Sequence, residues 1–105
     1  MDSSYLCIVT DEMSMSLMDY LNEHYESLSH IDKLSIFTQI VKAVHHCHGQ
    51  GIMHRDVKLE NVLVNVDKDA KISEVRLGDF GFACYTETLN SAKNFCGSIP
   101  YMAPE

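Results

Sequence analysis

The sequence predicts an α+β fold, because a long helical pattern in its first half is followed by several short strand patterns in its second half. The chain has 105 residues, which is enough for one small domain with a single hydrophobic core. Hydrophobic residues make up 46% of the chain and charged residues 22%, as in globular proteins and unlike disordered ones. We therefore expect one folded unit or a piece of one.

Two short elements are predicted ahead of the long helix. Residues 5–10 are an apolar run of strand-forming side chains that ends at two acidic residues, which predicts a buried strand and then a connector. A short amphipathic helix should follow, from residue 14 or 16 to about residue 24. The apolar residues at helical spacing in this stretch are Leu17, Met18 and Leu21.

The long helix is the clearest element in the sequence. Ser29 is a good N-cap, and Asp32 three residues later predicts a capping-box-like start that suits the helix dipole. Apolar and aromatic side chains then recur every three or four residues, which predicts one stripe packed against a core. The stripe consists of Ile31, Leu34, Phe37, Ile40, Val41, Val44 and His48. Gly49 and Gly51 provide the open backbone on which a helix ends.

Short strands and loops are predicted for the second half. Residues 51–54, 62–66 and 72–77 are strand-like runs separated by polar or turn residues, so we expect small antiparallel ribbons. Residues 67–71 should form an exposed turn between the last two strands. Residues 81–100 are polar and lack periodicity, which predicts a long loop that is functional or mobile.

Charge and cysteine content exclude several classes of protein. Eight lysine and arginine residues against fifteen aspartate and glutamate residues give a net charge of −7 without a basic stripe, which argues against a nucleic-acid partner. No signal-peptide pattern or membrane-spanning run is present, so we expect an intracellular protein, cytoplasmic or nuclear, with no membrane partner. The four cysteines are too widely spaced for a zinc knuckle or a disulfide framework: Cys7, Cys47, Cys84 and Cys96.

Four polar residues form a set with a chemical purpose. Asp56 supplies an acid that can orient a hydroxyl and accept its proton, and Lys58 supplies a cation for a phosphate. Asn61 offers an amide oxygen in the same loop, and Asp79 follows the last strand with a glycine two residues later. Both are oxygen ligands of the type that Mg²⁺ prefers. The set therefore predicts phosphoryl-transfer chemistry.

These motifs resemble those of the eukaryotic protein kinase family. Residues 54–61 match H-R-D-x-K-x-x-N, residues 79–81 match D-F-G and residues 103–105 match A-P-E, in the family's order and at about its distances. Lys58, and the Gly-Ser pair that precedes Tyr101, are similar to the serine/threonine type. The resemblance implies ATP and Mg²⁺ as cofactors and a protein substrate bearing Ser or Thr.

The resemblance extends over the whole chain and implies a partial kinase domain, mainly the front part of the helical C-lobe with small β-hairpins, with the N-lobe largely absent. Residues 1–13 would be the last N-lobe strand and the hinge, and residues 14–53 the C-lobe helices. Residues 54–61 would be the catalytic loop and residues 79–105 the activation segment.

The resemblance also implies a role for each matching residue. Asp56 would be the catalytic base, Lys58 the residue that steadies the transferring group, and Asn61 and Asp79 the Mg²⁺ ligands. Thr10 would be the gatekeeper of the nucleotide pocket. The positions that would bind ATP are Asp11, Met13, Glu60 and Leu63.

The sequence departs from the family pattern in ways that leave a second interpretation open. No glycine precedes Gly49 and no lysine precedes Lys33, so a Gly-rich phosphate loop and an N-lobe lysine are not found. The stretch between Asn61 and Asp79 is several residues longer than usual, and we expect the extra residues in the turn at 67–71. We expect a fragment whose own activity is doubtful; the alternative is a truncated or pseudokinase-like interaction module without turnover.

Three further features have alternative explanations. Asn94 occupies the usual position of a regulatory phosphate, so Arg55 is either satisfied by it and its neighbours or pairs with phosphate on Ser91 or Thr88. The cluster at residues 45–48 (His-His-Cys-His) suggests a metal site, but contiguous helical side chains point in different directions, and histidines that interact with the helix dipole are the simpler explanation. Cys96 suggests a redox switch, although no nearby group lowers its pKa visibly.

Overall fold

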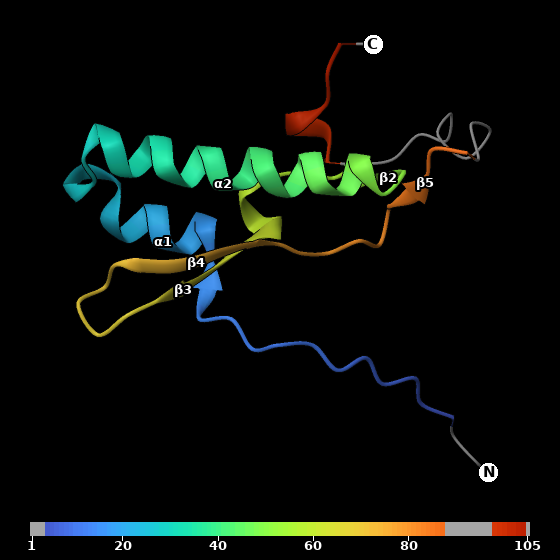
Figure 1. Cartoon of the computed structure of the whole chain (residues 1–105). Helices are drawn as coiled ribbons and strands as arrows, with labels where there is room; N and C mark the ends of the chain where they lie inside the picture. Colours follow the sequence, from blue (N-terminus) through green and yellow to red (C-terminus); the bar gives the residue numbers. More distant parts are fainter. Residues whose placement is uncertain (1–3, 88–97, 105) are drawn as a thin grey trace.

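The structure is a computed structural model that describes residues 4–87 and 98–104, and it contains two helices and two small antiparallel sheets (Figure 1). The helices are α1 (Leu17–His24) and α2 (His30–Gly49). One sheet has the strand order β1-β3-β4, with β1 (Met15–Ser16), β3 (Val62–Val66) and β4 (Ile72–Leu77). The other pairs β2 (Ile52–Met53) with β5 (Cys84–Tyr85). The predicted combination of helices with small antiparallel ribbons is confirmed.

Local capping contacts start both helices where the sequence predicts. The Ser16 hydroxyl accepts a hydrogen bond from the Asp19 N–H at 3.1 Å, one residue before α1. The Ser29 hydroxyl accepts from the Asp32 N–H at 3.0 Å, and the Asp32 carboxylate accepts from the Ser29 N–H at 3.2 Å. This reciprocal capping box satisfies amide groups that a helix start leaves without partners. After α2 ends, Gly51 has a φ of 72°, a conformation that glycine adopts at little cost.

The hairpin of β3 and β4 contains the predicted strands and the predicted turn. Its register places Val64 opposite Val75, and residues 67–71 connect the two strands. The Asp67 side chain accepts hydrogen bonds from the N–H groups of Asp69 at 2.8 Å and Lys71 at 3.0 Å. These bonds stabilise the turn in the way that aspartate commonly does. The Tyr20 hydroxyl donates to the Ala70 carbonyl at 3.0 Å, so the turn is also attached to α1.

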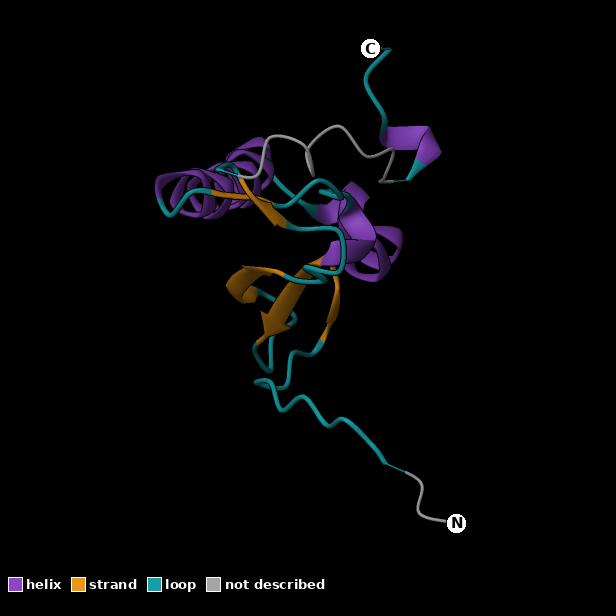
Figure 2. Ribbon diagram, turned by 90° about the vertical axis from the view of Figure 1, so that its right-hand side faces the viewer, coloured by secondary structure: helices purple, strands orange, loops and turns teal. Residues whose placement is uncertain are grey.

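Both helices pack on one face of the three-stranded sheet (Figures 1 and 2). Because side chains alternate between the two faces of a strand, Val62 and Val64 point toward the helices, while Leu63 and Asn65 lie on the opposite face. The inward side chains of β3 pack in one cluster with side chains of α1 and α2. The most buried hydrophobic residues in this core are Leu17, Tyr20, Ile36, Val62 and Val64.

The predicted buried strand at residues 5–10 is wrong. This segment has no strand assignment and extends away from the rest of the described chain (Figure 1). Its large hydrophobic side chains are exposed, for example Leu6 at 90% and Val9 at 94%. A strand needs neighbouring strands for its backbone hydrogen bonds and a covered face for its apolar side chains, and no described element provides either for these residues.

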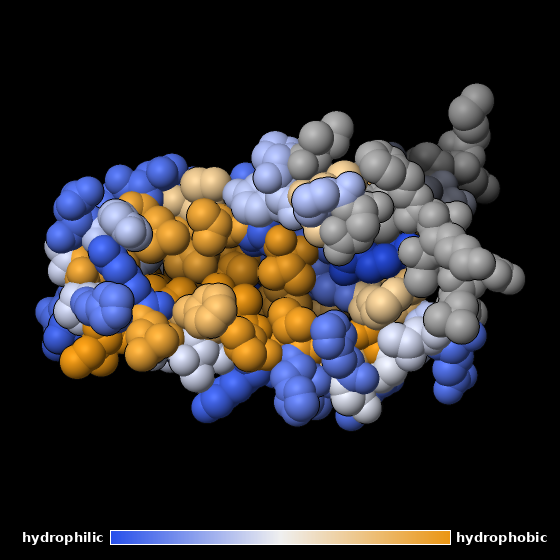
Figure 3. Space-filling view, turned by 90° about the horizontal axis from the view of Figure 1, so that it is seen from above, coloured by the Kyte–Doolittle hydropathy of each residue, from blue (hydrophilic) through white to orange (hydrophobic). Residues whose placement is uncertain are grey.

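The predicted core stripe of α2 is also wrong in part. Ile36 is the buried residue of this helix and Ile40 packs beside it, but the apolar side chains on its other faces are exposed. Exposed fractions are 77% for Ile31, 58% for Leu34, 62% for Phe37 and 48% for Val41. The reason is geometric: a small sheet and one short helix cover only a narrow side of α2, and apolar side chains spread over a broad outer face (Figure 3). Within residues 4–87 and 98–104, neither helix meets the length and hydropathy that crossing a bilayer requires.

Candidate active site

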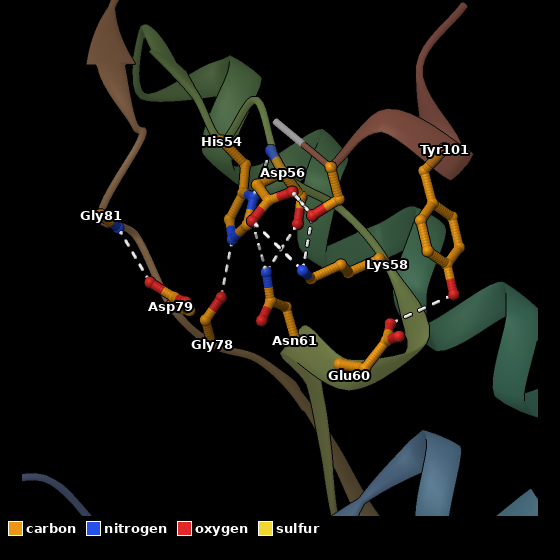
Figure 4. A network of polar contacts seen from close by, with 10 residues as sticks. His54, Asp56, Lys58, Glu60, Asn61, Gly78, Asp79, Gly81 and Tyr101 are labelled. Carbon is orange, nitrogen blue, oxygen red and sulfur yellow. Dashed lines mark hydrogen bonds and ion pairs between the residues drawn. The ribbon is translucent and has the colours of Figure 1, made fainter. Parts of the chain in front are cut away.

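Three buried polar side chains mark the candidate site, at the loop between β2 and β3 (Figure 4). His54 is 2% exposed, and Asp56 and Asn61 are each 7% exposed. The loop turns sharply at Arg55, which has a φ of 69°, and Asp79 beyond β4 has a φ of 49°. Left-handed backbone at residues other than glycine is uncommon and clusters at functional sites. These two positions therefore flank the same group of polar side chains, whereas Ala70, with a φ of 59°, lies in the turn between β3 and β4.

Asp56 is held by hydrogen bonds from two directions. The Ser98 hydroxyl donates to its Oδ1 at 2.9 Å, and the Asn61 amide donates to its Oδ2 at 3.0 Å. The same Asn61 amide also donates to the Asp56 backbone carbonyl at 2.8 Å, so that Asn61 fixes both the side chain and the backbone of Asp56. The carboxylate therefore has one defined orientation.

Lys58 completes a ring of polar contacts with Asp56 and Ser98. Its ammonium donates to the Ser98 hydroxyl at 2.5 Å and lies 3.9 Å from Asp56 Oδ2 (Figure 4). Asp56 and Lys58 of one loop and the distant Ser98 thus bring together an anion, a cation and a hydroxyl. This arrangement can orient an alcohol and hold a negatively charged group beside it.

The environment of Asp56 favours its ionised form. Burial alone would raise its pKa, because removal of water disfavours the carboxylate. The hydrogen bonds from Ser98 and Asn61, together with the nearby charge of Lys58, outweigh that effect and hold the pKa below its ordinary value. Asp56 is therefore a carboxylate at neutral pH and can accept a hydrogen bond from a substrate hydroxyl.

His54 connects the Asp56 loop to the segment that follows β4. Its Nδ1 accepts a hydrogen bond from the Asp56 N–H at 3.1 Å, so its Nε2 carries the proton and donates to the Gly78 carbonyl at 2.7 Å. The Gly78 N–H in turn donates to the Asn61 carbonyl at 2.7 Å. The His54 ring meets the Phe80 ring edge to face, with centroids 4.7 Å apart. These contacts fix the backbone of Asn61 next to that of Asp79.

Asn61 and Asp79 offer oxygen ligands that suit Mg²⁺, but their side chains do not meet in this structure. The amide nitrogen of Asn61 is bound to Asp56, which leaves its oxygen on the side away from Asp56 (Figure 4). Asp79 is exposed, and its Oδ1 accepts from the Gly81 N–H at 3.2 Å. Carboxylate and amide oxygens fit the chemistry of Mg²⁺, which also keeps water and substrate phosphate ligands. The residues present therefore fit the ion.

The residues with a predicted role in nucleotide binding lie mostly around one cavity. A cavity of about 740 Å³ on the outer face of the sheet is lined by Thr10, Asp11, Met13, Leu63 and Asp79, among others. Leu63 contributes an apolar side chain from β3, the middle strand of the three-stranded sheet. Glu60 lies elsewhere, where its carboxylate accepts from the Tyr101 hydroxyl at 3.1 Å.

Asp56 lines a different cavity from Asp79. Its cavity measures about 260 Å³ and is formed with Arg55, Val57, Ser98, Tyr101, Met102 and Ala103. The structure thus does not bring Asp56 and Asp79 to a common cavity. His54 and Gly78 provide the physical connection between the two.

Sequence reasoning missed two residues of the site. Ser98 appeared only as part of a motif, yet it contacts both Asp56 and Lys58 from about forty positions away. His54 likewise belongs to a motif, and the motif does not indicate the connecting role of its two ring nitrogens. Their place in the motifs was the available signal, but no spacing rule indicates a contact between distant loops.

The other sequence hypotheses find no support in the described residues or lie outside them. Among residues 4–87 and 98–104, no group of three or more His, Cys, Asp or Glu side chains could hold a metal ion, and this includes the cluster at residues 45–48. Thr88, Ser91, Asn94 and Cys96 lie outside the described residues. Arg55 donates through its Nε to the Phe82 carbonyl at 2.6 Å.

The described residues form two helices and small antiparallel sheets, with a buried aspartate beside a lysine in the loop between β2 and β3. Comparison with known proteins identifies the family, because the family model described as protein kinase domain matches residues 1–105. The chain therefore belongs to the protein kinase family.

Three curated relatives illustrate the relationship. The liver/testis isoform of the phosphorylase b kinase gamma catalytic chain from Mus musculus is 38% identical over 98% of this chain and 24% of its own length. NUAK family SNF1-like kinase 2 from Rattus norvegicus is 39% identical over 99% of this chain and 16% of its own length. Mitosis inducer protein kinase cdr1 from Schizosaccharomyces pombe is 37% identical over 85% of this chain and 14% of its own length. The chain spans about a quarter or less of these relatives.

Proposed function

We propose that the protein that contains this chain transfers the γ-phosphoryl group of ATP to serine or threonine hydroxyls of proteins. The observation that carries the proposal is the polar ring of Asp56, Lys58 and Ser98, in which a buried carboxylate is kept ionised beside a cation. Phosphoryl transfer depends mainly on positioning and on neutralisation of charge, and the ring supplies both. The serine/threonine class rests on Lys58 and on the kinases that the chain is similar to.

In the proposed reaction a bond forms between the substrate hydroxyl oxygen and the γ-phosphorus, while the bond from that phosphorus to the bridging oxygen of ADP breaks. Asp56 accepts a hydrogen bond from the hydroxyl and takes its proton, and Lys58 donates to the oxygens of the group in transit. Asn61 and Asp79 would hold Mg²⁺, which when bound neutralises charge on the phosphates. The hydrogen bond from the Gly81 N–H occupies only Oδ1 of the Asp79 carboxylate, which has two oxygens that could serve as ligands.

The same proposal assigns the parts of the chain. In the full-length protein, residues 1–13 would be the last N-lobe strand and the hinge, although residues 5–10 have no strand assignment in this structure. Residues 14–53 would be the C-lobe helices, residues 54–61 the catalytic loop and residues 79–105 the activation segment. The cavity of about 740 Å³ would hold the adenine ring, with Leu63 beneath it and the backbone of Asp11 and Met13 beside it. Placement of Glu60 near ATP remains a prediction, since its contact in this structure is to Tyr101.

A matched pair of substitutions tests the proposal. In the full-length gene product, Asp56→Asn should lower kcat for ATP-dependent phosphorylation of a serine- or threonine-containing protein by about 10²- to 10⁴-fold, the usual contribution of a general base. Asp69→Asn is the control, because it makes the same change at an exposed position of the turn between β3 and β4 and should leave kcat unchanged. A wild-type protein that binds MgATP but phosphorylates no protein would instead support an interaction module without turnover.

A further inference from the structure

The outer face of the β3–β4 hairpin carries polar side chains next to Leu63, the residue of β3 that lines the large cavity. Because Leu63 is opposite Arg76 and Asn65 is opposite Glu74 in the antiparallel register, all four lie on the face that is turned away from the hydrophobic core. Leu63 and Arg76 line the cavity of about 740 Å³. Three side chains on this face, Asn65, Glu74 and Arg76, are joined to one another and are called the anchor network below.

Within the anchor network, Glu74 links the two strands. Its Oε1 accepts from Arg76 Nε at 2.6 Å, and its Oε2 accepts from Asn65 Nδ2 at 3.0 Å. The hydrogen bond from Arg76, followed by that from Asn65, lowers the pKa of Glu74. Glu74 is therefore a carboxylate at neutral pH and holds Asn65 and Arg76 in fixed orientations.

The anchor network fixes the connector at residues 11–14 at both of its ends. At one end, Arg76 Nη1 is paired with the Asp11 carboxylate at 2.6 Å. At the other end, Asn65 Oδ1 accepts from the Ser14 N–H at 2.9 Å and from the Ser14 hydroxyl at 3.3 Å. The two contacts join positions 65 and 51 residues apart in the sequence. Between the two anchored ends lies Met13, which also lines the cavity.

This attachment decides where one wall of the cavity lies. Residues 4–14 have no helix or strand assignment, and the structure gives them no place in the hydrophobic core. Apart from the pairing of β1 with β3, which starts only at Met15, and a hydrogen bond from the Val66 N–H to the Ser14 hydroxyl at 3.3 Å, these polar contacts are what orient the connector relative to Leu63. A wall held by a few side chains should move when they are lost, and the binding of a flat ligand between wall and floor should weaken with it.

We propose that Asn65 and Arg76 are positioning residues for the ligand in this cavity. They hold the connector at residues 11–14 in a fixed position relative to Leu63, which lines the same cavity. The proposal rests on the proposed function, in which the ligand is the adenine part of ATP. Neither side chain has to touch the ligand. The effect should therefore appear in ligand affinity and in KM for ATP, and not in kcat.

Adenosine is the probe that separates positioning from direct charge attraction, because it carries no phosphate. We would measure the affinities of the full-length gene product for adenosine and for MgATP by calorimetry, together with kcat and KM for ATP. Arg76→Met and Asn65→Ala should each weaken both ligands by the same factor of about three to five, the range expected for loss of a partly exposed ion pair or hydrogen bond. The kcat should stay within about twofold of wild type, since the Asp56 ring is untouched.

A conservative variant and a control complete the experiment. Arg76→Lys keeps a positive charge beside Asp11 and Glu74, so it should weaken both ligands less than Arg76→Met does. Lys68→Met removes one positive charge from the exposed turn of the same hairpin and should change neither affinity. A fall in thermal stability and kcat with unchanged KM would show a structural role only and would overturn the proposal.

The remaining outcomes are equally distinct. Weaker binding of MgATP with unchanged binding of adenosine would mean that Arg76 attracts the phosphates, and positioning would be rejected. Unchanged binding of both ligands by Arg76→Met and Asn65→Ala would reject the anchor network while leaving the proposed function intact. Failure of the wild-type protein to bind either ligand would reject the nucleotide site itself.

Discussion

Replacing His54 with phenylalanine removes one hydrogen bond within the Asp56 loop and one that joins this loop to the segment after β4, while it keeps an aromatic ring of similar size. The ring is 2% exposed and lies edge to face with Phe80, and phenylalanine can keep that contact. Two backbone groups would lose their partner, namely the Asp56 N–H and the Gly78 carbonyl. The substitution therefore tests polar connection separately from packing.

The expected loss of stability follows from these two backbone groups. A buried polar group left without a partner costs about 1–3 kcal/mol, and water can reach Gly78 in part, so His54→Phe should lower the free energy of unfolding by about 2–4 kcal/mol. The relative placement of Asn61 and Asp79 also depends on this connection. We expect kcat to fall by about 10- to 100-fold, because small errors in the placement of reacting groups are costly.

Urea denaturation followed by circular dichroism measures the stability, and initial rates at saturating ATP give kcat. His46→Phe is the matched control, because His46 is exposed in the last turn of α2 and its replacement should change stability by less than about 0.5 kcal/mol. If His54→Phe unfolds at the same urea concentration as wild type and keeps its kcat, the two loops are not coupled through His54, and the reasoning fails.

Two further predictions concern the helix cap and the response to acid. Ser29→Ala should lower the free energy of unfolding by about 1 kcal/mol in urea denaturation, because α2 loses its capping box, whereas Ser35→Ala in the same helix should not destabilise; equal stability of the two variants would contradict this. The hydrogen bonds from Ser29 lower the pKa of Asp32, and the pKa of Asp56 is lowered because the contacts from Ser98, Lys58 and Asn61 outweigh burial. A lowered pKa in the folded state adds stability above the unfolded value of about 4, and this stability is lost as the pH falls through the folded values. The urea midpoint should therefore decrease from pH 5 to pH 3, and a midpoint that rises over this range would refute the assignment.

Local sequence determined the two helices, the β3–β4 hairpin and the polar residues of the Asp56 loop. Ser29 and Asp32 predict the start of α2 because a capping box involves residues only three apart, and the hairpin is predictable from alternating apolar residues around a turn. The motif residues Asp56, Lys58 and Asn61 lie within one loop, so their association needs little knowledge of the rest of the fold.

Tertiary structure alone decided which surfaces are covered and which distant residues meet. Helical periodicity shows that α2 is amphipathic, but only the position of the sheet selects Ile36 over the exposed Phe37. Residues 5–10 look like a strand because strand propensity is local, whereas strand formation requires partners. The contacts of Ser98 with Asp56 and of Asp11 with Arg76 join side chains that are 42 and 65 residues apart. Such contacts arise because the packed core brings separate loops together, and no short-range pattern in the sequence encodes their geometry.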